Sequence, residues 1–447
     1  LVADFKDGVY GKNSGLSTLD GVLNHTRSSA ATYLDSAGLP QTAASGVARD
    51  NHHVYNGSAW VKEGYLHEPE AATNLLLNSG TLSTQNVTVT AVPNTLHFTG
   101  TGTVTLSGAA TDGPLVGTGT GENNRVNLTF TPSAGTLTLT VSGTVTNAQL
   151  EEGSVPTSYI PSAGSTVTRA ADTLTLPVAN IPYPEPVVIG PELVTNGVDP
   201  VTIAGWSAFA VGGPQDDSRL TASGGVFNID SSSGNTRAEY GVATSIGKTY
   251  RLEVDITAIG AGNRYWIQKS DTALTAGTTL LGPFSSSGSH TVVFVASATT
   301  TYVHMHFDNL GAETGSFNDV SVREINPLAV SFGYKALVTG QNSGFVNWTA
   351  DADNGILIDA GTNDFTFTQE AGGTVDSVTG GSYTSGINVP VSIAMRNGST
   401  FVNGADDGTA LTANTTPTAF PDLAATDLII APSGGPQIIQ EFIMWGG

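Results

Sequence analysis

The side chains with the clearest potential for chemistry are aromatic and histidine residues near the middle of the chain. They are Trp206, Tyr265, Trp266, Tyr302, His304 and His306. Exposed aromatic rings stack against the C–H faces of sugars, and a few polar groups beside them fix the sugar hydroxyls. We therefore predict that these residues contact carbohydrate. The alternative is that they pack in a hydrophobic core or form an ordinary polar sheet face.

The segment Tyr302-Val-His-Met-His-Phe307 indicates how such a site is built. Side chains alternate between the two faces of a β-strand, so Val303, Met305 and Phe307 share one face, which belongs in a core. The opposite face, with its tyrosine and two histidines, is left for solvent or a groove. The two histidines also have the spacing of metal ligands, but no third ligand is near in sequence, and metal sites need three or four.

Acidic residues near the C-terminal end form a candidate calcium site. Asp351 and Asp353 fall in a loop after a tryptophan, and Asp359 follows shortly afterwards. Clustered oxygen ligands are what Ca²⁺ requires. The alternative is that the Asp-Asn-Gly sequence in this region is an ordinary hairpin turn. No other cofactor is expected.

The sequence lacks the motifs expected of a glycosidase and of several other classes of enzyme. Glycosidases place two carboxylates across the scissile bond, and no Glu-x-Asp-x-x-Glu motif of sandwich-fold glucanases is present. Glu151 and Glu152 are adjacent and are expected to diverge. No nucleophile elbow or phosphate loop occurs. We therefore expect a binding protein rather than an enzyme, although carboxylates from separate modules could still meet at an interface.

Charge and composition exclude several classes of protein. The 447-residue chain has 38 acidic and 16 basic residues and a formal net charge of −22. Binding of nucleic acid requires the opposite sign, so no nucleic acid partner is expected. No apolar run approaches the roughly 20 residues of a membrane span, so no membrane insertion is expected. The chain contains no cysteine, which removes disulfides and thiol chemistry.

The pattern of the sequence predicts an all-β fold. Charged residues make up only 12% of the chain, and Gly reaches 54 residues, which suits many short strands joined by tight turns. Alternation of apolar and polar residues is frequent, as in Thr136-Leu-Thr-Leu-Thr-Val141. Strands with one apolar face stack in pairs of sheets. We therefore predict tandem antiparallel β-sandwiches.

The chain divides into regions of different character. Residues 1–72 are the least regular and are expected to form an N-terminal arm or anchor. Residues 73–163 are rich in Thr and Gly and are expected to form a first jelly-roll sandwich. Residues 187–325 form a second strand-rich module and residues 326–447 a third, with the stiff Pro-rich end of residues 164–186 as a connector.

Residues 192–324 resemble the jelly-roll carbohydrate-binding modules of glycanases and phage proteins. The matching pieces are Glu192-Leu-Val-Thr-Asn-Gly197, Gly205-Trp206, Tyr250-Arg-Leu-Glu-Val-Asp255 and Phe317-Asn-Asp-Val-Ser-Val322. Members of this family bind glycan through aromatic residues on one sheet face or at a loop edge. The resemblance therefore implies a carbohydrate-binding role for the second module.

Residues 24–183 together with 326–445 resemble a family of bacteriophage virion proteins, which includes tail-fibre and head-fibre proteins. The segments that carry the resemblance include Thr26-Arg-Ser-Ser-Ala-Ala-Thr-Tyr33, Glu68-Pro-Glu-Ala-Ala-Thr-Asn-Leu-Leu-Leu77, Gln149-Leu-Glu-Glu-Gly-Ser-Val-Pro-Thr-Ser-Tyr-Ile-Pro161 and Thr168-Arg-Ala-Ala-Asp-Thr-Leu174. The last module also looks like a concanavalin-like lectin or glucanase sandwich. In this family, residues 164–186 and 326–447 would form one such sandwich.

The resemblance implies a topology and a biological setting. The 187–325 module would be inserted into a loop of the concanavalin-like sandwich, which requires the two ends of the insert to lie close together. The protein would be a fibre or spike on the virion surface, outside the cell. Its partners would be other virion proteins and a host-surface polysaccharide, and its assembly a homotrimer. A purely structural decoration protein that binds no glycan is the alternative, and a polysaccharide depolymerase is a third interpretation.

Overall fold

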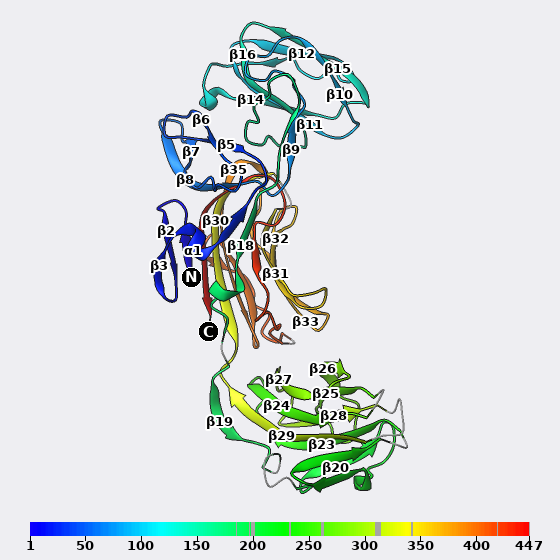
Figure 1. The fold of residues 1–447 in the computed structure, drawn as a ribbon. Helices are drawn as coiled ribbons and strands as arrows, with labels where there is room; N and C mark the ends of the chain where they lie inside the picture. Colours follow the sequence, from blue (N-terminus) through cyan, green and yellow to red (C-terminus); the bar gives the residue numbers. More distant parts are fainter. Residues whose placement is uncertain are drawn as a thin grey trace.

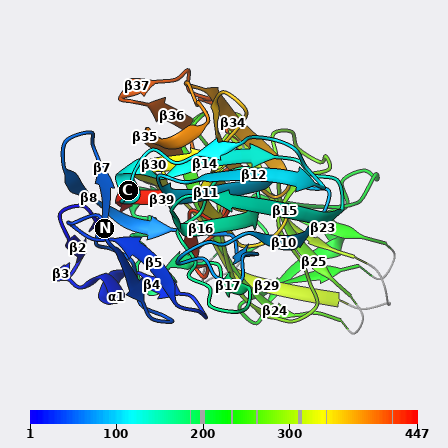
Figure 2. The same ribbon diagram turned by 90° about the horizontal axis from the view of Figure 1, so that it is seen from above.

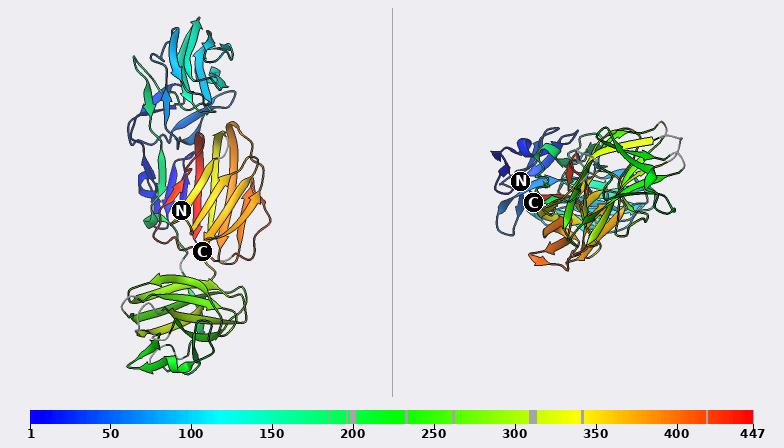
Figure 3. Two further views of the ribbon diagram at one scale, coloured as in Figure 1. Left: turned by 90° about the vertical axis from the view of Figure 1, so that its right-hand side faces the viewer. Right: turned by 90° about the horizontal axis from the view of Figure 1, so that it is seen from below.

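The computed structural model describes residues 1–184, 186–195, 197, 202–231, 234–260, 263–308, 314–340, 343–417 and 419–446. The chain forms three β-sandwiches in a row (Figure 1). We call them the first sandwich (residues 73–163), the central sandwich and the inserted sandwich (residues 187–325). Figure 3 shows the same elongated arrangement from the side, with the central sandwich between the other two.

The predicted all-β class is confirmed. The strands of each sandwich pair in antiparallel fashion. Examples are β11 (Asn94–Gly100) with β16 (Val145–Glu152), β23 (Thr236–Ala243) with β28 (Thr300–Phe307), and β30 (Ala329–Gly340) with β39 (Gln437–Gly446). The helical elements of the described residues are short: α1 (Leu19–Val22) and the 3₁₀ helices η1 (Glu122–Asn124), η2 (Val178–Asn180) and η3 (Asp217–Arg219). Strands and tight turns therefore form nearly all of the regular structure, as expected of a chain rich in Gly, Thr and Asn.

Two large sheets make up the central sandwich. One sheet has the strand order β3 (Gly15–Ser17), β2 (Val9–Lys12), β1 (Val2–Asp4), β39 (Gln437–Gly446), β30 (Ala329–Gly340), β35 (Gly386–Gly398), β36 (Val402–Asp406) and β37 (Thr409–Ala410). The other has the order β34 (Thr374–Gly380), β33 (Phe365–Ala371), β32 (Gly355–Ala360), β31 (Gly344–Thr349), β38 (Leu428–Ile430), β18 (Thr173–Leu176) and β4 (Asn24–Thr26). Their inner faces enclose one continuous core around Trp348, Phe332 and Phe345.

The first 26 residues differ from the expected irregular arm. β1 pairs with β39, and β4 pairs with β18, so this segment adds strands to both sheets of the central sandwich. The terminal amine of Leu1 donates to the carbonyl oxygen of Met444 at 2.8 Å, and the two termini lie side by side in Figure 2. Strands of three or four residues are too short to show an alternation pattern, and their partners lie at the other end of the chain. These short strands could therefore not be predicted from the sequence alone.

The first sandwich packs a four-stranded sheet on a three-stranded sheet. The four-stranded sheet has the order β10 (Gln85–Val89), β15 (Gly135–Ser142), β12 (Thr103–Gly108) and β13 (Leu115–Val116), and the other has the order β14 (Val126–Phe130), β11 (Asn94–Gly100) and β16 (Val145–Glu152). A separate apolar core that includes Leu96, Phe98 and Leu150 fills the space between the sheets.

Residues 27–72 form small hairpins between the first and central sandwiches rather than an arm. They contribute β5 (Ala31–Leu34), β6 (Pro40–Ala43), β7 (His52–Tyr55) and β8 (Trp60–His67), and β9 (Ala72–Asn74) then pairs with β17 (Val167–Arg169). β8 also extends the first large sheet by pairing with β39. These hairpins lie where the first sandwich meets the central one (Figure 1).

A buried network of charged side chains, which we call the junction network, joins these elements. It consists of Arg27, Arg49, Glu68, Arg169 and Asp172, all 3% exposed or less. Asp172 accepts from Arg27 at 3.0 Å and also from Arg49. Glu68 accepts from Arg49 at 2.6 Å, and its carboxylate lies 3.1 Å from Arg169.

The first sandwich reaches the junction network through Ser158. The backbone N–H and the hydroxyl of Ser158 both donate to the Glu68 carboxylate, each at 2.7 Å. Burial by itself would raise the pKa of Glu68, but Arg169, Arg49 and these hydrogen bonds outweigh it and hold that pKa well below its usual range. Both carboxylates of the network are thus ionised at neutral pH, because the pKa of Asp172 is lowered as well.

The inserted sandwich has two sheets. One has the order β21 (Leu220–Ser223), β22 (Val226–Asp230), β29 (Thr314–Ile325), β24 (Thr249–Ala258) and β27 (Gly288–Val295), with β19 (Val188–Glu192) also paired to β29. The other, which we call the site sheet, has the order β20 (Trp206–Ala210), β23 (Thr236–Ala243), β28 (Thr300–Phe307), β25 (Tyr265–Ser270) and β26 (Thr278–Phe284).

The two ends of this module are held together. Asn326 donates its backbone N–H to the carbonyl oxygen of Val187 at 2.9 Å, and Val188 is paired with Ile325. β18 before the module and β30 after it belong to the two opposite sheets of the central sandwich. The module therefore extends from a loop of the central sandwich, and Thr249 contacts Ser399 across the boundary at 2.9 Å between hydroxyl oxygens.

We predict that Asp172→Asn destabilises the protein by about 3–5 kcal/mol, because two buried guanidinium groups lose their shared carboxylate. The measurement is urea unfolding at pH 7. Lys335→Ala is the matched control: its ion pair with Glu441 spans 3.1 Å but lies on the surface, so a loss below about 1 kcal/mol is expected. Equal losses in the two variants would contradict the role given to the junction network.

Acid should destabilise the protein in two stages. Burial lowers the pKa of His67 to about 4 and that of His52 to about 3, so both stay neutral in the folded chain while their unfolded forms take up protons below about pH 6.5. Stability therefore falls as the pH drops from about 6.5 towards 4. The folded pKa values of Glu68 and Asp172 are lowered, so these carboxylates stabilise the folded chain above about pH 4. Their contribution to stability is lost as the pH falls further, because the unfolded carboxylates are then protonated first.

The measurement is the free energy of urea unfolding between pH 7 and 4, compared with the variant His67→Gln. This variant keeps an N–H donor for the Ala431 carbonyl, which His67 Nε2 contacts at 2.9 Å. It should show a shallower decline across this range. A slope identical to that of the parent protein would exclude His67 as a source of acid sensitivity.

Candidate functional site

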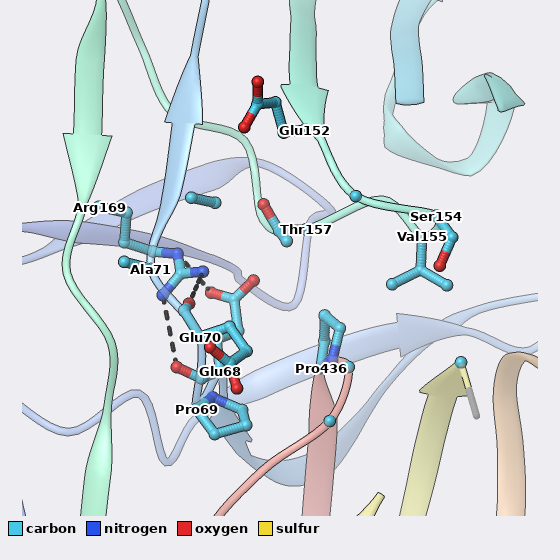
Figure 4. A pocket seen from close by; sticks show the side chains of 15 residues that line it. Glu68, Pro69, Glu70, Ala71, Glu152, Ser154, Val155, Thr157, Arg169 and Pro436 are labelled. Atoms are coloured by element: carbon cyan, nitrogen blue, oxygen red, sulfur yellow. Dashed lines mark hydrogen bonds and ion pairs between the residues drawn. The ribbon is translucent and has the colours of Figure 1, made fainter. Parts of the chain in front are cut away.

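A cleft of about 280 Å³ lies at the junction of the first and central sandwiches (Figure 4). Its lining includes Glu68, Glu70, Glu152, Val155 and Arg169. The Arg169 guanidinium donates to the carbonyl oxygen of Glu70 at 2.8 Å and lies 3.1 Å from the Glu68 carboxylate. Its charge is therefore already compensated within the protein. The cleft is best understood as part of the junction rather than as a site that requires a ligand.

A stronger candidate is the face of the site sheet that points away from the core, which we call the outer face. Alternate residues of its strands fill the core of the inserted sandwich: Ala208, Ala238, Ile267, Val303 and Met305. The residues between them therefore lie on the outer face. That face carries Phe209, Arg237, Glu239, Trp266, Gln268, Tyr302, His304 and His306.

Some of the residues predicted to contact carbohydrate lie on this face, whereas others lie in the core. Trp206 and Tyr265 are 5% and 0% exposed and belong to the core. The Trp206 ring packs against Phe227 and Phe317, with centroids 4.8 and 5.4 Å away. The prediction of sugar contact at these two residues is therefore wrong, because large apolar rings gain more from burial between two sheets than at a surface.

His304 lies on the outer face but is closed off from solvent. It is 0% exposed, and its Nε2 atom lies 3.2 Å from the Glu239 carboxylate. The Glu239 carboxylate also accepts the backbone N–H of Leu274 at about 3 Å. Gly277 lies so close that a Cβ atom there would be 2.8 Å from His304 Nδ1. The segment 271–277 thus covers this end of the outer face, and His304 is unavailable for direct contact with a glycan.

The other end of the outer face holds Trp266, His306 and Arg264. The half-buried Trp266 ring stacks on His306, with a centroid distance of 4.9 Å and an interplanar angle of 25°. The Arg264 guanidinium lies 5.2 Å from the Trp266 ring and pairs with Asp308 at 3.0 Å. Tyr302 lies further along the same strand and is half-buried.

His306 is 8% exposed, and in the part of the chain that the structure describes neither of its ring nitrogens has a hydrogen-bond partner. Burial, with a smaller effect of Arg237, lowers its pKa to about 4. A neutral imidazole offers one N–H donor and one acceptor. Buried polar atoms without hydrogen-bond partners are rare in folded proteins, so the two ring nitrogens of His306 are unusual.

Arg237 and Gln268 are the site residues that sequence reasoning missed. Arg237 is cross-strand to His306, which is cross-strand to Trp266. Its Nε atom donates to the Gln268 side-chain oxygen at 3.0 Å. The alternation of side chains along each strand could have indicated both residues. Arg237 and Glu239 flank the core residue Ala238 in one strand, and Trp266 and Gln268 flank the core residue Ile267 in another. Without the sheet order, nothing in the sequence placed these two strands on either side of His306.

The candidate calcium ligands do not form one cluster. Asp351 and Asp353 lie in the turn between β31 and β32, where Asp351 accepts the backbone N–H of Asp353 at 2.8 Å. Asp359 is paired with Gly344 at the opposite end of β32, about 13 Å along the strand from Gly355. The hairpin-turn alternative therefore describes Asp351 and Asp353. Among the described residues, no group of three His, Asp or Glu side chains could hold a metal ion.

No helix among the described residues is long and apolar enough to cross a membrane. No protein-family model matches the sequence, and no curated protein matches it. Among solved structures, 21 chains match. One is the adhesin domain of Epf from Streptococcus pyogenes, with 10% sequence identity and a TM-score of 0.22 over 52% of this chain and 96% of that chain.

The two tryptophans provide a test of the two faces of the site sheet. We predict that Trp206→Ala costs about 3–5 kcal/mol of stability, because it leaves a cavity among packed rings. Trp266→Ala should cost less than about 1.5 kcal/mol, since it removes a half-buried ring from the outer face. Thermal unfolding of the two variants measures both effects. A larger loss for Trp266→Ala than for Trp206→Ala would contradict the assignment of faces.

Proposed function

We propose that this chain is a surface-exposed binding protein that recognises carbohydrate through the outer face of the site sheet. One observation carries the proposal: the outer face brings the half-buried Trp266 ring together with His306, Arg237 and Gln268, on the side of the sheet opposite the core. Aromatic surface beside a few convergent polar groups is the chemistry that sugar recognition needs.

Each group has a role that follows from its chemistry. The Trp266 ring supplies apolar surface for the C–H face of a sugar. The neutral His306 ring offers a donor and an acceptor that lack partners among the described residues. Gln268 donates to Thr279 at 3.1 Å while accepting from Arg237, which fixes the orientation of the guanidinium before a ligand arrives. Preorganised groups lose less entropy when they bind.

We further propose that the protein belongs to the surface of a bacteriophage particle, as a fibre or spike subunit, and acts without catalysis. The resemblance to virion proteins supports this. Its segments supply Arg27, Glu68, Ser158, Arg169 and Asp172, and these residues form the contact between two sandwiches. The segments therefore have a structural role suited to a rigid, elongated particle protein. Other virion proteins, with assembly as a trimer, and a host polysaccharide remain the proposed partners.

A purely structural decoration protein is the second candidate. It is favoured by the segment 271–277, which closes one end of the outer face over His304 and Glu239. In that case the polar side chains of the outer face serve only to hold this covering segment in place.

The test is a glycan array with the full chain, repeated with Trp266→Ala. We expect binding to a subset of bacterial surface glycans and a loss of up to about tenfold in the variant, since an aromatic contact contributes up to roughly 1.5 kcal/mol. Trp445→Ala is the matched control, because Trp445 is an exposed tryptophan of the central sandwich. Absence of binding across the array would favour the decoration protein, and shortened polysaccharide after incubation would reveal a depolymerase.

A further inference from the structure

Arg237 is a buried charge to which the described residues supply no counter-charge. It is 5% exposed, and the hydrogen bond that its side chain makes among the described residues goes from Nε to the neutral amide of Gln268. No carboxylate lies within ion-pair distance of it among the residues that the structure describes. Its Nη1 and Nη2 atoms make no hydrogen bond in the described part of the chain. Removing a guanidinium from water without a partner is costly, so this arrangement asks for a physical reason.

Other buried arginines of the protein show the contrast. Arg27 and Arg49 both contact Asp172, and Arg169 lies against Glu68. Even the exposed Arg264, just before β25 of the site sheet, is paired with Asp308 at 3.0 Å. The protein thus supplies carboxylates readily where guanidinium groups are buried, as expected for a chain with 38 acidic residues.

The carboxylate nearest in sequence on the same face does not serve Arg237. Glu239 lies two residues further along β23, but its oxygens accept the Leu274 N–H and lie beside His304. Burial is the cause that lowers the pKa of Arg237, with no attraction from an acidic group to offset it. An arginine nevertheless keeps its charge at neutral pH. Arg237 therefore has no counter-charge among the described residues, and an anion that reached its guanidinium from outside would supply one.

We propose that the outer face selects an acidic saccharide, one whose sugar ring carries a carboxylate, as in a uronic acid. This inference rests on the proposed carbohydrate function and specifies its ligand class. The Nη1 and Nη2 atoms of Arg237 form the fork that pairs with both oxygens of a carboxylate. Trp266, placed across His306 from Arg237, packs against the ring of the same or the adjacent sugar.

The negative charge of the whole protein confines the recognition of an acidic saccharide to this one site. With a net charge of −22, the protein repels polyanions in general. Only a site with an unpaired cation in a partly dehydrated setting can overcome that repulsion, because the attraction is much stronger away from bulk water. Binding should therefore require both the carboxylate and the sugar, and it should weaken as salt screens the pair.

The experiment compares oligosaccharides of galacturonate, glucuronate and mannuronate with the same oligosaccharides after reduction of their carboxylates to neutral hydroxymethyl groups. Calorimetric titration of the full chain measures the affinity for each pair. We expect at least one acidic oligosaccharide to bind tenfold or more tightly than its reduced form. Arg237→Gln should abolish that preference, so that the variant binds the acidic and the reduced form of each oligosaccharide with equal affinity.

Arg323→Gln is the matched control, because Arg323 is a more exposed arginine on the other sheet of the same sandwich and is paired with Glu192. It should bind like the parent protein. If Arg237→Gln does not fold, Arg237→Lys keeps the charge but not the fork, and it should retain only part of the preference. The comparison of acidic and reduced sugars in the parent protein needs no variant.

The outcomes separate the two proposals. Equal affinity for the acidic and reduced forms, or a preference that survives Arg237→Gln, overturns the acidic-saccharide inference and leaves carbohydrate binding in place. Binding of neither form, together with a blank glycan array, overturns both. A tenfold preference that depends on Arg237 establishes the inference.

Discussion

The arrangement of the first and central sandwiches depends on the ionic contacts between buried arginines and two carboxylates. Arg27, Arg49 and Arg169 come from different segments, yet they meet on Glu68 and Asp172. Each buried ion costs several kcal/mol to remove from water, and only close, hydrogen-bonded partners repay that cost. The network therefore tolerates little displacement of any segment. It fixes the hairpins of residues 27–72 between two sandwiches that otherwise have separate cores.

The inserted sandwich follows a different principle. Its own core, with Trp206, Phe227 and Phe317 at one end, stabilises it from within. Its ends are joined through Val187 and Asn326, so it can project from the central sandwich without disturbing it. The contrast between the two kinds of arginine is informative. At the junction every described buried guanidinium meets a carboxylate, whereas among the described residues the guanidinium of Arg237 on the outer face donates to an amide alone. Stability explains the first arrangement, and the proposed recognition of an acidic saccharide would explain the second.

Much of the fold class and part of the site were readable from local patterns. Alternation in Tyr302-Val-His-Met-His-Phe307 correctly separated the core residues Val303 and Met305 from the outer face. It could not tell whether the outer face was open, and a covering segment closes it over His304. The same limitation applies to Trp206 and Tyr265, since an aromatic residue suits a core as well as a sugar-binding surface.

The sequence by itself determined the all-β class, the strand-rich modules and the absence of thiol chemistry, because these depend on composition and on neighbours two residues apart. Only the tertiary structure decided the rest. The three-residue strand β1 is defined by its pairing with β39 at the other end of the chain. Arg237, Trp266 and His306 become neighbours only when β23, β28 and β25 lie side by side. Such contacts depend on sheet order, which is set by the packing of whole layers and is not encoded in any local window of sequence.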